Sequence, residues 1–203
     1  TICSNAGFLG NPIAQGVFGM MGLTLASIYL IPQRIMMWSE GVSVFTEAPT
    51  KKEMLKKIFT HPCIIACEIG IVLMLTGWRP PHFLEETITS VSNCNTAMSM
   101  LVIGMILADA DPKTIIDKDV LFYTFIRLLI IPFCVFIPCW LLRIDSLVMG
   151  VSVILAAMPA GATTTILASK YDCEEEFSVK LVVFSTAASL ITTPLWNMIL
   201  LKF

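Results

Sequence analysis

One stretch decides the fold: Ser4-Asn5-Ala6-Gly7-Phe8-Leu9-Gly10-Asn11-Pro12. It lies within a run from Thr1 to Gln33 that contains no Asp, Glu, Lys or Arg, which is typical of a membrane-embedded segment. Pro12 lacks an N–H and clashes with the preceding turn, so we expect a helix to break there. In hydrocarbon, such a break is tolerated only against protein or a wet cavity. A broken helix with polar neighbours is typical of a transporter site, although a packing kink gives the same pattern.

The composition indicates a membrane protein with several spans. Of the 203 residues, 56% are hydrophobic and only 14% are charged, against about 25% charged in soluble domains. The seven cysteines form no C-x-x-C pair and lie mostly in apolar runs, so we interpret them as packing residues. No basic cluster suggests nucleic acid, and we expect no metal and no cofactor.

The polarity pattern predicts about seven membrane segments in an all-α chain. The opening run is too long for one span, because about 20 residues cross the hydrocarbon. Glycines near 19–22 therefore predict a tight turn that ends a broken helix, followed by a second helix over 23–45. The remaining spans are expected at 62–78, 87–108, 120–142, 146–169 and 177–201.

The positive charges predict the orientation of these spans. Seven lysines lie in the loops after the second, fourth and sixth spans: Lys51, Lys52, Lys56, Lys57, Lys113, Lys118 and Lys170. The opposite loops hold only Arg79 and Arg143. By the positive-inside rule, the lysine-rich loops are cytoplasmic and the C-terminus lies outside the cell (plasma or inner) membrane.

Four polar residues inside or near the spans are candidates for polar or coupling roles: Arg34, Glu68, Asn93 and Arg127. Ionisable groups within a span are costly and are often functional. The alternatives are a helix-packing contact for Glu68 and, for Arg127, a side chain that extends to the interface.

A second uncharged run, 146–169, is interrupted by Met158-Pro159-Ala160-Gly161, with Thr163 and Thr164 just beyond. Interrupted segments at corresponding positions of two halves are the best sequence indication of a transporter site. The half-helix N-termini at such breaks carry free N–H groups and partial positive charge, which suits an anionic substrate.

Both interrupted segments resemble one family of permeases. The motifs are Ser4-Asn5-x-Gly7-Phe8-x-Gly10-x-Pro12 with Phe18-Gly19, and Met158-Pro159-Ala160-Gly161 with Ala168-Ser169-Lys170-Tyr171. They are similar to the auxin efflux carrier family, which includes bacterial malate-type permeases and plant auxin exporters. The stretches 29–42 and 61–66 look more like the bacterial branch.

The resemblance implies a ten-helix fold of two inverted five-helix repeats, whose broken fourth and ninth helices cross near the midplane. These helices match 1–19 and 146–169. Residues 1–46 then end the first repeat, 47–61 form a cytoplasmic linker, and 62–203 form the second repeat. We expect the first three helices to precede Thr1, which makes the sequence N-terminally truncated. The implied substrate site consists of Ser4, Asn5, Gly7, Gly10, Pro12, Met158, Pro159, Ala160, Gly161, Thr163 and Thr164.

The resulting hypothesis is a secondary carrier of small organic anions, such as malate or auxin-like compounds, that works by alternating access. Its expected partners are the substrate and the bilayer, with a homodimer left open. The alternatives are a sodium-coupled symporter of the bile-acid-transporter type, and a remnant or assembly partner that does not transport. An enzyme is disfavoured, because His61 and His82 are far apart and no catalytic motif accompanies them.

Overall fold

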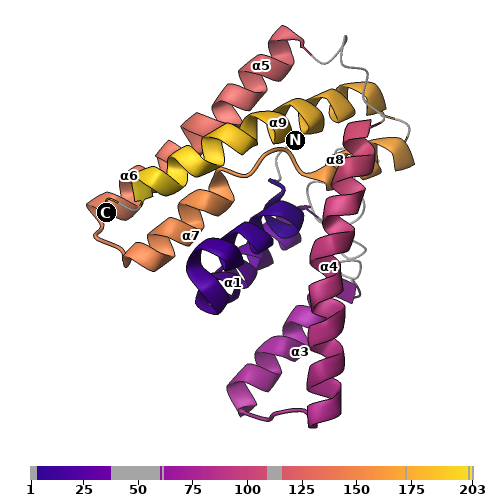
Figure 1. Cartoon of the computed structure of the whole chain (residues 1–203), viewed down its shortest axis with the longest axis vertical. Coiled ribbons are helices and arrows are strands. Elements are labelled where there is room, and N and C mark those ends of the chain that lie inside the picture. Colours follow the sequence, from indigo (N-terminus) through magenta and orange to yellow (C-terminus); the bar gives the residue numbers. More distant parts are fainter. Residues whose placement is uncertain are drawn as a thin grey trace.

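The computed structural model describes residues 4–37, 60, 62–108, 116–171, 173–200 and 202, and within these ranges every regular element is a helix. Figure 1 shows their arrangement. The elements are the π turn η1 (Ala6–Gly10), α1 (Asn11–Met36), α3 (Pro62–Thr76), α4 (His82–Ala108), α5 (Lys118–Phe125), the π turn η3 (Ile126–Ile130), α6 (Ile131–Leu141), α7 (Ser146–Ala156), α8 (Ala162–Lys170) and α9 (Glu175–Leu200). The predicted all-α class is confirmed for this part of the chain.

The helix α1 is a hairpin folded at Gly19. Gly19 has φ 68° and ψ −159°, a backbone conformation that is essentially restricted to glycine. The second arm returns along the first. The side chain of Gln33, near the end of the second arm, donates hydrogen bonds to Ser4, which lies 29 residues earlier. The predicted turn is therefore confirmed. The expected end of the second arm, at Phe45, lies outside the described residues.

The predicted break at Pro12 is wrong. The helix runs through Pro12, which lies in the first turn of α1 directly after the π turn η1. The same sequence of a π turn and then a proline recurs at η3 and Pro132. A proline clashes with the carbonyl four residues before it, and the wider turn relieves that clash. The irregular backbone of this segment instead lies at Asn5, with φ −76° and ψ 37°.

The predicted break at Pro159 is confirmed. The helix α7 ends at Ala156 and α8 begins at Ala162, with the residues between them outside any helix. The N–H of Ala157 donates to Val153 O at 2.9 Å and closes the last turn of α7. Pro159 has no N–H to continue it, so the chain leaves the helix there.

Three described stretches are long and apolar enough to cross a membrane: Ala6–Met36, Lys118–Leu141 and Glu175–Leu200. The first is folded in half at Gly19, so each of its arms is shorter than its full length suggests. The helix α4 begins at His82, five residues before the expected span. The total of seven segments and the inverted repeat stay predictions.

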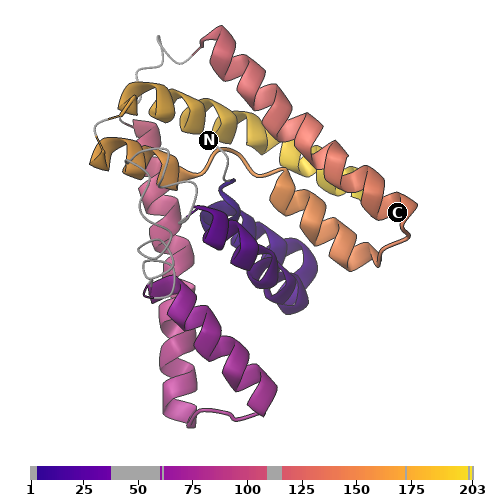
Figure 2. The ribbon, with the colours of Figure 1, turned by 180° about the vertical axis from the view of Figure 1, so that it is seen from behind.

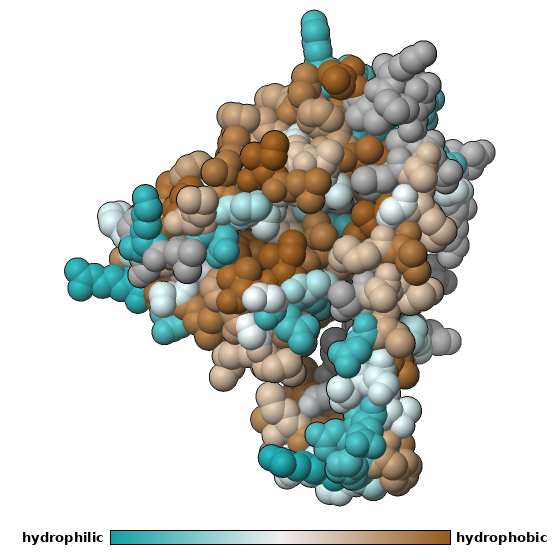
Figure 3. All heavy atoms as spheres, in the orientation of Figure 1, coloured by the Kyte–Doolittle hydropathy of each residue, from teal (hydrophilic) through white to brown (hydrophobic). Residues whose placement is uncertain are grey.

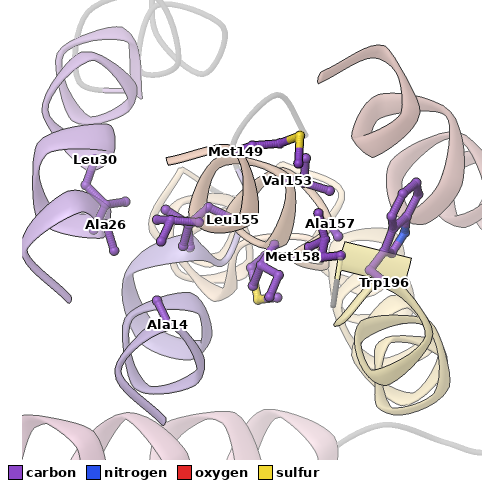
Figure 4. Packing of buried hydrophobic residues seen from close by; sticks show 13 residues of the cluster. Ala14, Ala26, Leu30, Met149, Val153, Leu155, Ala157, Met158 and Trp196 are labelled. Atoms are coloured by element: carbon purple, nitrogen blue, oxygen red, sulfur yellow. The ribbon is translucent and has the colours of Figure 1, made fainter. Parts of the chain in front are cut away.

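The apolar core is centred on α7, which packs against α1 on one side and against α9 on another. Figure 4 shows Ala14 and Ala26, from the two arms of α1, on the side of Leu155 of α7. On the other side of the core, the indole N–H of the buried Trp196 donates to Leu128 O at 2.9 Å. The Trp196 ring meets Phe133 edge to face, with 4.7 Å between ring centroids. These contacts join α9 to the helix formed by α5, η3 and α6.

The hairpin of α3 and α4 extends away from the other helices, as Figures 1 and 2 both show. The helix α4 contacts η1 and α9, and α3 touches α1. Most of the described side chains of this hairpin are exposed, and Ile103 is an exception. The hairpin is therefore the part of the molecule that is least tightly packed against the breaks.

The surface suits a lipid environment. Figure 3 shows hydrophobic atoms across most of the visible face and hydrophilic atoms gathered at its tips. Large apolar side chains such as Leu75 and Leu190 are 77% and 75% exposed. Soluble monomers rarely expose apolar surface on this scale, which indicates contact with lipid or with further protein.

Candidate functional site

The two irregular segments meet in space. The backbone N–H of Asn5 donates to Pro159 O at 2.8 Å, and Ser4 pairs with Ala160 in an antiparallel bridge. Residues far apart in the sequence therefore form a short two-stranded contact between helices. Because this contact satisfies backbone groups that neither helix can satisfy alone, each irregular segment stabilises the other.

Two side chains form hydrogen bonds with further backbone groups at the second break. The guanidinium Nε–H of Arg127, from η3, donates to Met158 O at 3.2 Å. The hydroxyl of Ser185, from α9, accepts the N–H of Ala160 at 3.1 Å. Both side chains are buried. Within a membrane an unsatisfied backbone group is costly, so these bonds explain how the break persists.

A small cavity lies beside this contact, between the α1 hairpin and the start of α8. Its volume is about 30 Å³, which is room for one or two water molecules. Two wider hollows of about 540 Å³ lie at the α6–α7 and α3–α4 turns, open to the surface and away from the breaks. The small cavity is lined by Ser4, Asn5, Gly7, Phe8, Leu30, Gln33, Arg34, Met37 and Thr163, none of which is acidic.

One buried amide, from Asn5, and one half-buried amide, from Gln33, supply polar groups to the cavity. Asn5 is only 3% exposed, and its Nδ2 has no acceptor in the part of the chain described. The Nε2 of Gln33 donates to Ser4 O at 2.9 Å and to Ser4 Oγ at 3.2 Å, while its Oε1 has no donor there. An unpaired buried amide costs about 1–3 kcal/mol, so these groups are suited to bind a polar ligand.

The guanidinium group of Arg34 adds a positive charge to the cavity lining. The half-buried Arg34 lies over the backbone of Gly7, and a Cβ at Gly7 would stand 2.9 Å from Arg34 Nη2. The guanidinium has five N–H donors in a planar fork that matches a carboxylate. Among the described residues that line the cavity, Arg34 carries the one charge, and that charge is positive.

The structure brings together only some of the predicted site residues. Ser4, Asn5, Gly7 and Thr163 line the cavity, together with Arg34. Gly10 instead packs against Leu155 and Met158, which helps the two segments approach closely. The contact itself involves Met158, Pro159 and Ala160, with Gly161 as the N-cap of α8.

Other predicted residues lie elsewhere. Pro12 and Thr164 do not line the cavity. Glu68 and Asn93 are exposed on α3 and α4. Arg127 is buried at the second break, so its side chain does not extend to the interface.

Sequence reasoning missed Gln33 and Ser185. Gln33 carried a signal, because it is a polar residue beside Arg34 within an apolar stretch. Ser185 carried none, since serine is common in membrane helices. Across the described ranges, no group of His, Cys, Asp and Glu side chains could hold a metal ion.

Comparison with known proteins shows the family of this chain. The model of a family described as membrane transport protein matches residues 48–197. An uncharacterized transporter from Methanothermobacter thermautotrophicus is 27% identical over 198 residues, covering 97% of this chain and 65% of the relative. A second, from Methanocaldococcus jannaschii, is 25% identical over 207 residues, covering 100% of this chain and 67% of the relative.

A plant protein is also similar. Auxin efflux carrier component 8 of Arabidopsis thaliana is 24% identical over 152 residues, covering 71% of this chain and 41% of that protein. The chain spans about two thirds of the length of the archaeal transporters it matches. From its motifs, its paired irregular segments and these similarities, the chain belongs to the membrane transport protein family of the auxin efflux carriers.

Proposed function

We propose that the protein is a secondary carrier of small organic anions that binds a substrate carboxylate where the irregular backbone at Asn5 meets the break at Pro159. The observation that carries this proposal is the cavity beside the contact between Asn5 and Pro159, which Arg34 makes positive. Small carboxylates such as malate, and auxin-like acids, are the substrate classes that this chemistry suits.

The cavity supplies complementary groups for a carboxylate. The guanidinium of Arg34 can donate two parallel hydrogen bonds to its oxygens. The Nδ2 of Asn5, which has no acceptor among the described residues, provides a further donor. Thr163, in the first turn of α8, lies at the positive end of that helix. The Oε1 of Gln33, which accepts no hydrogen bond from the residues that the structure describes, can accept one from a hydroxyl of the substrate.

Transport requires this cavity to open, because about 30 Å³ is too small for a dicarboxylate. The helix α4 contacts η1 directly, and its hairpin with α3 is packed loosely against the rest. A movement of this hairpin relative to the crossing segments would expose the cavity, in line with alternating access by rocking of one bundle. The plasma-membrane location and the homodimer stay part of this proposal.

Uptake by proteoliposomes tests the proposal. The full-length protein is reconstituted and assayed with labelled malate and a panel of mono- and dicarboxylates. Asn5→Ala removes a donor and Pro159→Ala alters the contact, so each is expected to lower uptake by about tenfold or more. Leu190→Ala, on the exposed face of α9, is the matched control and should transport normally. Wild-type uptake of no carboxylate, or unchanged uptake by both site variants, would count against this function.

A further inference from the structure

The N-terminal half of α4 has a polar face, which consists of Glu85, Thr89 and Ser92. These residues follow one another at spacings of four and three positions. At about 3.6 residues per turn, such spacings place the three side chains on one side of the helix, and all three are exposed. The apolar Val91 and Met98 lie away from this side and are also exposed. This half of α4 is therefore amphipathic.

The polar face points the same way as the part of α4 that packs on the other helices. Ile103 follows Ser92 by eleven residues, which is about three helical turns, so the two lie on the same side. Among the described side chains of α4, Ile103 is the buried one. The helix contacts η1 and α9, so this side of α4 is turned toward them. Since η1 directly follows Asn5, which lines the cavity, the polar face leads toward the cavity.

A hollow of about 540 Å³ lies where the polar face begins, and it is open to the surface. Its lining consists of His82, Glu85, Glu86, Thr89 and Ser90. Figure 3 shows hydrophilic atoms gathered on this hairpin, at the lower end of the view. Ser92 lies ten residues beyond His82, about 15 Å along the helix and so about half-way through about 30 Å of hydrocarbon. The polar face thus extends from an open hollow to the middle of the membrane.

Polar side chains at this depth need water or protein as neighbours, because an unsatisfied polar group in hydrocarbon is costly. The proposed transport cycle requires a path to the cavity between the α3–α4 hairpin and the other helices, and the polar face lies on that side. We propose that Glu85, Thr89 and Ser92 form one wall of a water-filled vestibule that leads a small hydrated organic anion between the outer surface and the cavity. The proposal rests on the proposed carrier function and deepens it, because it assigns the path of the substrate.

The mouth of this vestibule carries negative charge. Glu86 Oε1 lies 3.5 Å from His82 Nδ1. The described residues give Glu85 no ion pair. A fixed negative charge lowers the local concentration of anions near it. Glu85 therefore weakens the entry of an anion from outside, before the anion reaches Arg34.

Cysteine accessibility in the full-length protein tests the vestibule without a substrate. Ser92→Cys and Val91→Cys are placed singly in a cysteine-free background, and intact cells are treated with a membrane-impermeant, negatively charged thiosulfonate. The thiolate is the reactive form and needs water, so Ser92→Cys should react at least about tenfold faster than Val91→Cys, its matched control at the same depth. Equal rates at the two positions, or reaction of Ser92→Cys only after permeabilisation, would overturn the vestibule.

Uptake kinetics test the charge at the mouth. Glu85→Gln should lower the KM for an external dicarboxylate by about two- to fivefold at about 0.01 M salt. The effect should vanish near 1 M salt, where the Debye length is about 3 Å. Glu175→Gln, exposed at the start of α9 on the predicted cytoplasmic side, is the matched control and should leave this KM unchanged. A KM for Glu85→Gln equal to that of the wild type at low salt would overturn the role of Glu85.

The two measurements also separate the vestibule from the proposed function. If no carboxylate is transported while Ser92→Cys reacts faster than Val91→Cys, the proposed substrate class fails and the vestibule stands. If carboxylates are transported while Ser92→Cys does not react, the carrier function stands and the vestibule fails.

Discussion

At the residue scale, Gly7 and Arg34 show how a missing side chain positions a charge. The guanidinium lies in the space that a methyl group on Gly7 would take, with Nη2 2.9 Å from that point. The neighbour is the far end of a flexible side chain, so Gly7→Ala should move Arg34 rather than unfold the hairpin. The glycine therefore matters for the cavity more than for stability.

Transport kinetics of the Gly7→Ala variant test whether Gly7 leaves the space that positions Arg34. We expect the KM for the transported carboxylate to rise by about tenfold, because a charge-assisted hydrogen bond contributes about 1.5–3 kcal/mol. Arg34→Gln should raise the KM at least as much. Gly16→Ala is the control, since a Cβ there meets nothing within 4 Å. A KM for Gly7→Ala equal to that of Gly16→Ala would contradict the assigned position of Arg34.

At the residue scale, the site predicted from the sequence includes some of the residues that line the cavity. Ser4, Asn5, Gly7 and Thr163 were in the predicted site because the resemblance to the permease family implies a site at the two interrupted segments, where these residues lie. Gln33 was not, because its role depends on a hydrogen bond to a residue 29 positions earlier. That contact exists only after the α1 hairpin has folded, and no local pattern reveals it.

At the element scale, the sequence predicted some of the places where the helices turn or end. The turn at Gly19 and the break at Pro159 were predicted, because both follow from local backbone restrictions. Pro12 was misjudged, because a proline interrupts a helix only where the preceding turn cannot widen. The π turns before Pro12 and Pro132 supply that width, and sequence patterns do not yet distinguish the two outcomes.

The backbone conformation of Gly19 in the α1 hairpin leads to a prediction about stability. Gly19→Ala forces an L-residue into φ 68° and ψ −159°, which should lower the free energy of unfolding by about 1–3 kcal/mol. Gly70→Ala is the matched control in the exposed part of α3, where a Cβ meets nothing within 4 Å. Titration of each variant with a denaturing detergent in mixed micelles measures its free energy of unfolding. Equal stability of the two variants would show that the hairpin does not depend on this turn.

At the scale of the whole molecule, the contact between the two irregular segments adds a polar junction to the apolar packing of the helices. The contact between Asn5 and Pro159 joins α1 to the segment between α7 and α8, and Arg127 and Ser185 tie that segment to η3 and α9. The α3–α4 hairpin stays outside this network and meets it mainly through α4. The described helices therefore form one tightly connected body, and the α3–α4 hairpin is attached to it loosely enough to move during a transport cycle.

The orientation of the whole molecule can be tested on one helix. Lys118–Leu141 is continuous over 24 residues, or about 36 Å at 1.5 Å per residue, enough to cross about 30 Å of hydrocarbon. Its two ends must then face opposite sides of the membrane. The distribution of lysines predicts that Lys118 lies in the cytoplasm and that Arg143, just beyond the other end, lies outside.

Single cysteines in a cysteine-free background give the measurement. Arg143→Cys should react with a membrane-impermeant maleimide on intact cells, whereas Lys118→Cys should react only after permeabilisation. Arg143 is exposed in the α6–α7 turn and Lys118 is exposed at the start of α5, so both sites are accessible to the reagent. The reverse pattern would invert the assigned topology and place the C-terminus in the cytoplasm. Labelling of both cysteines on intact cells would show that this helix does not span the membrane.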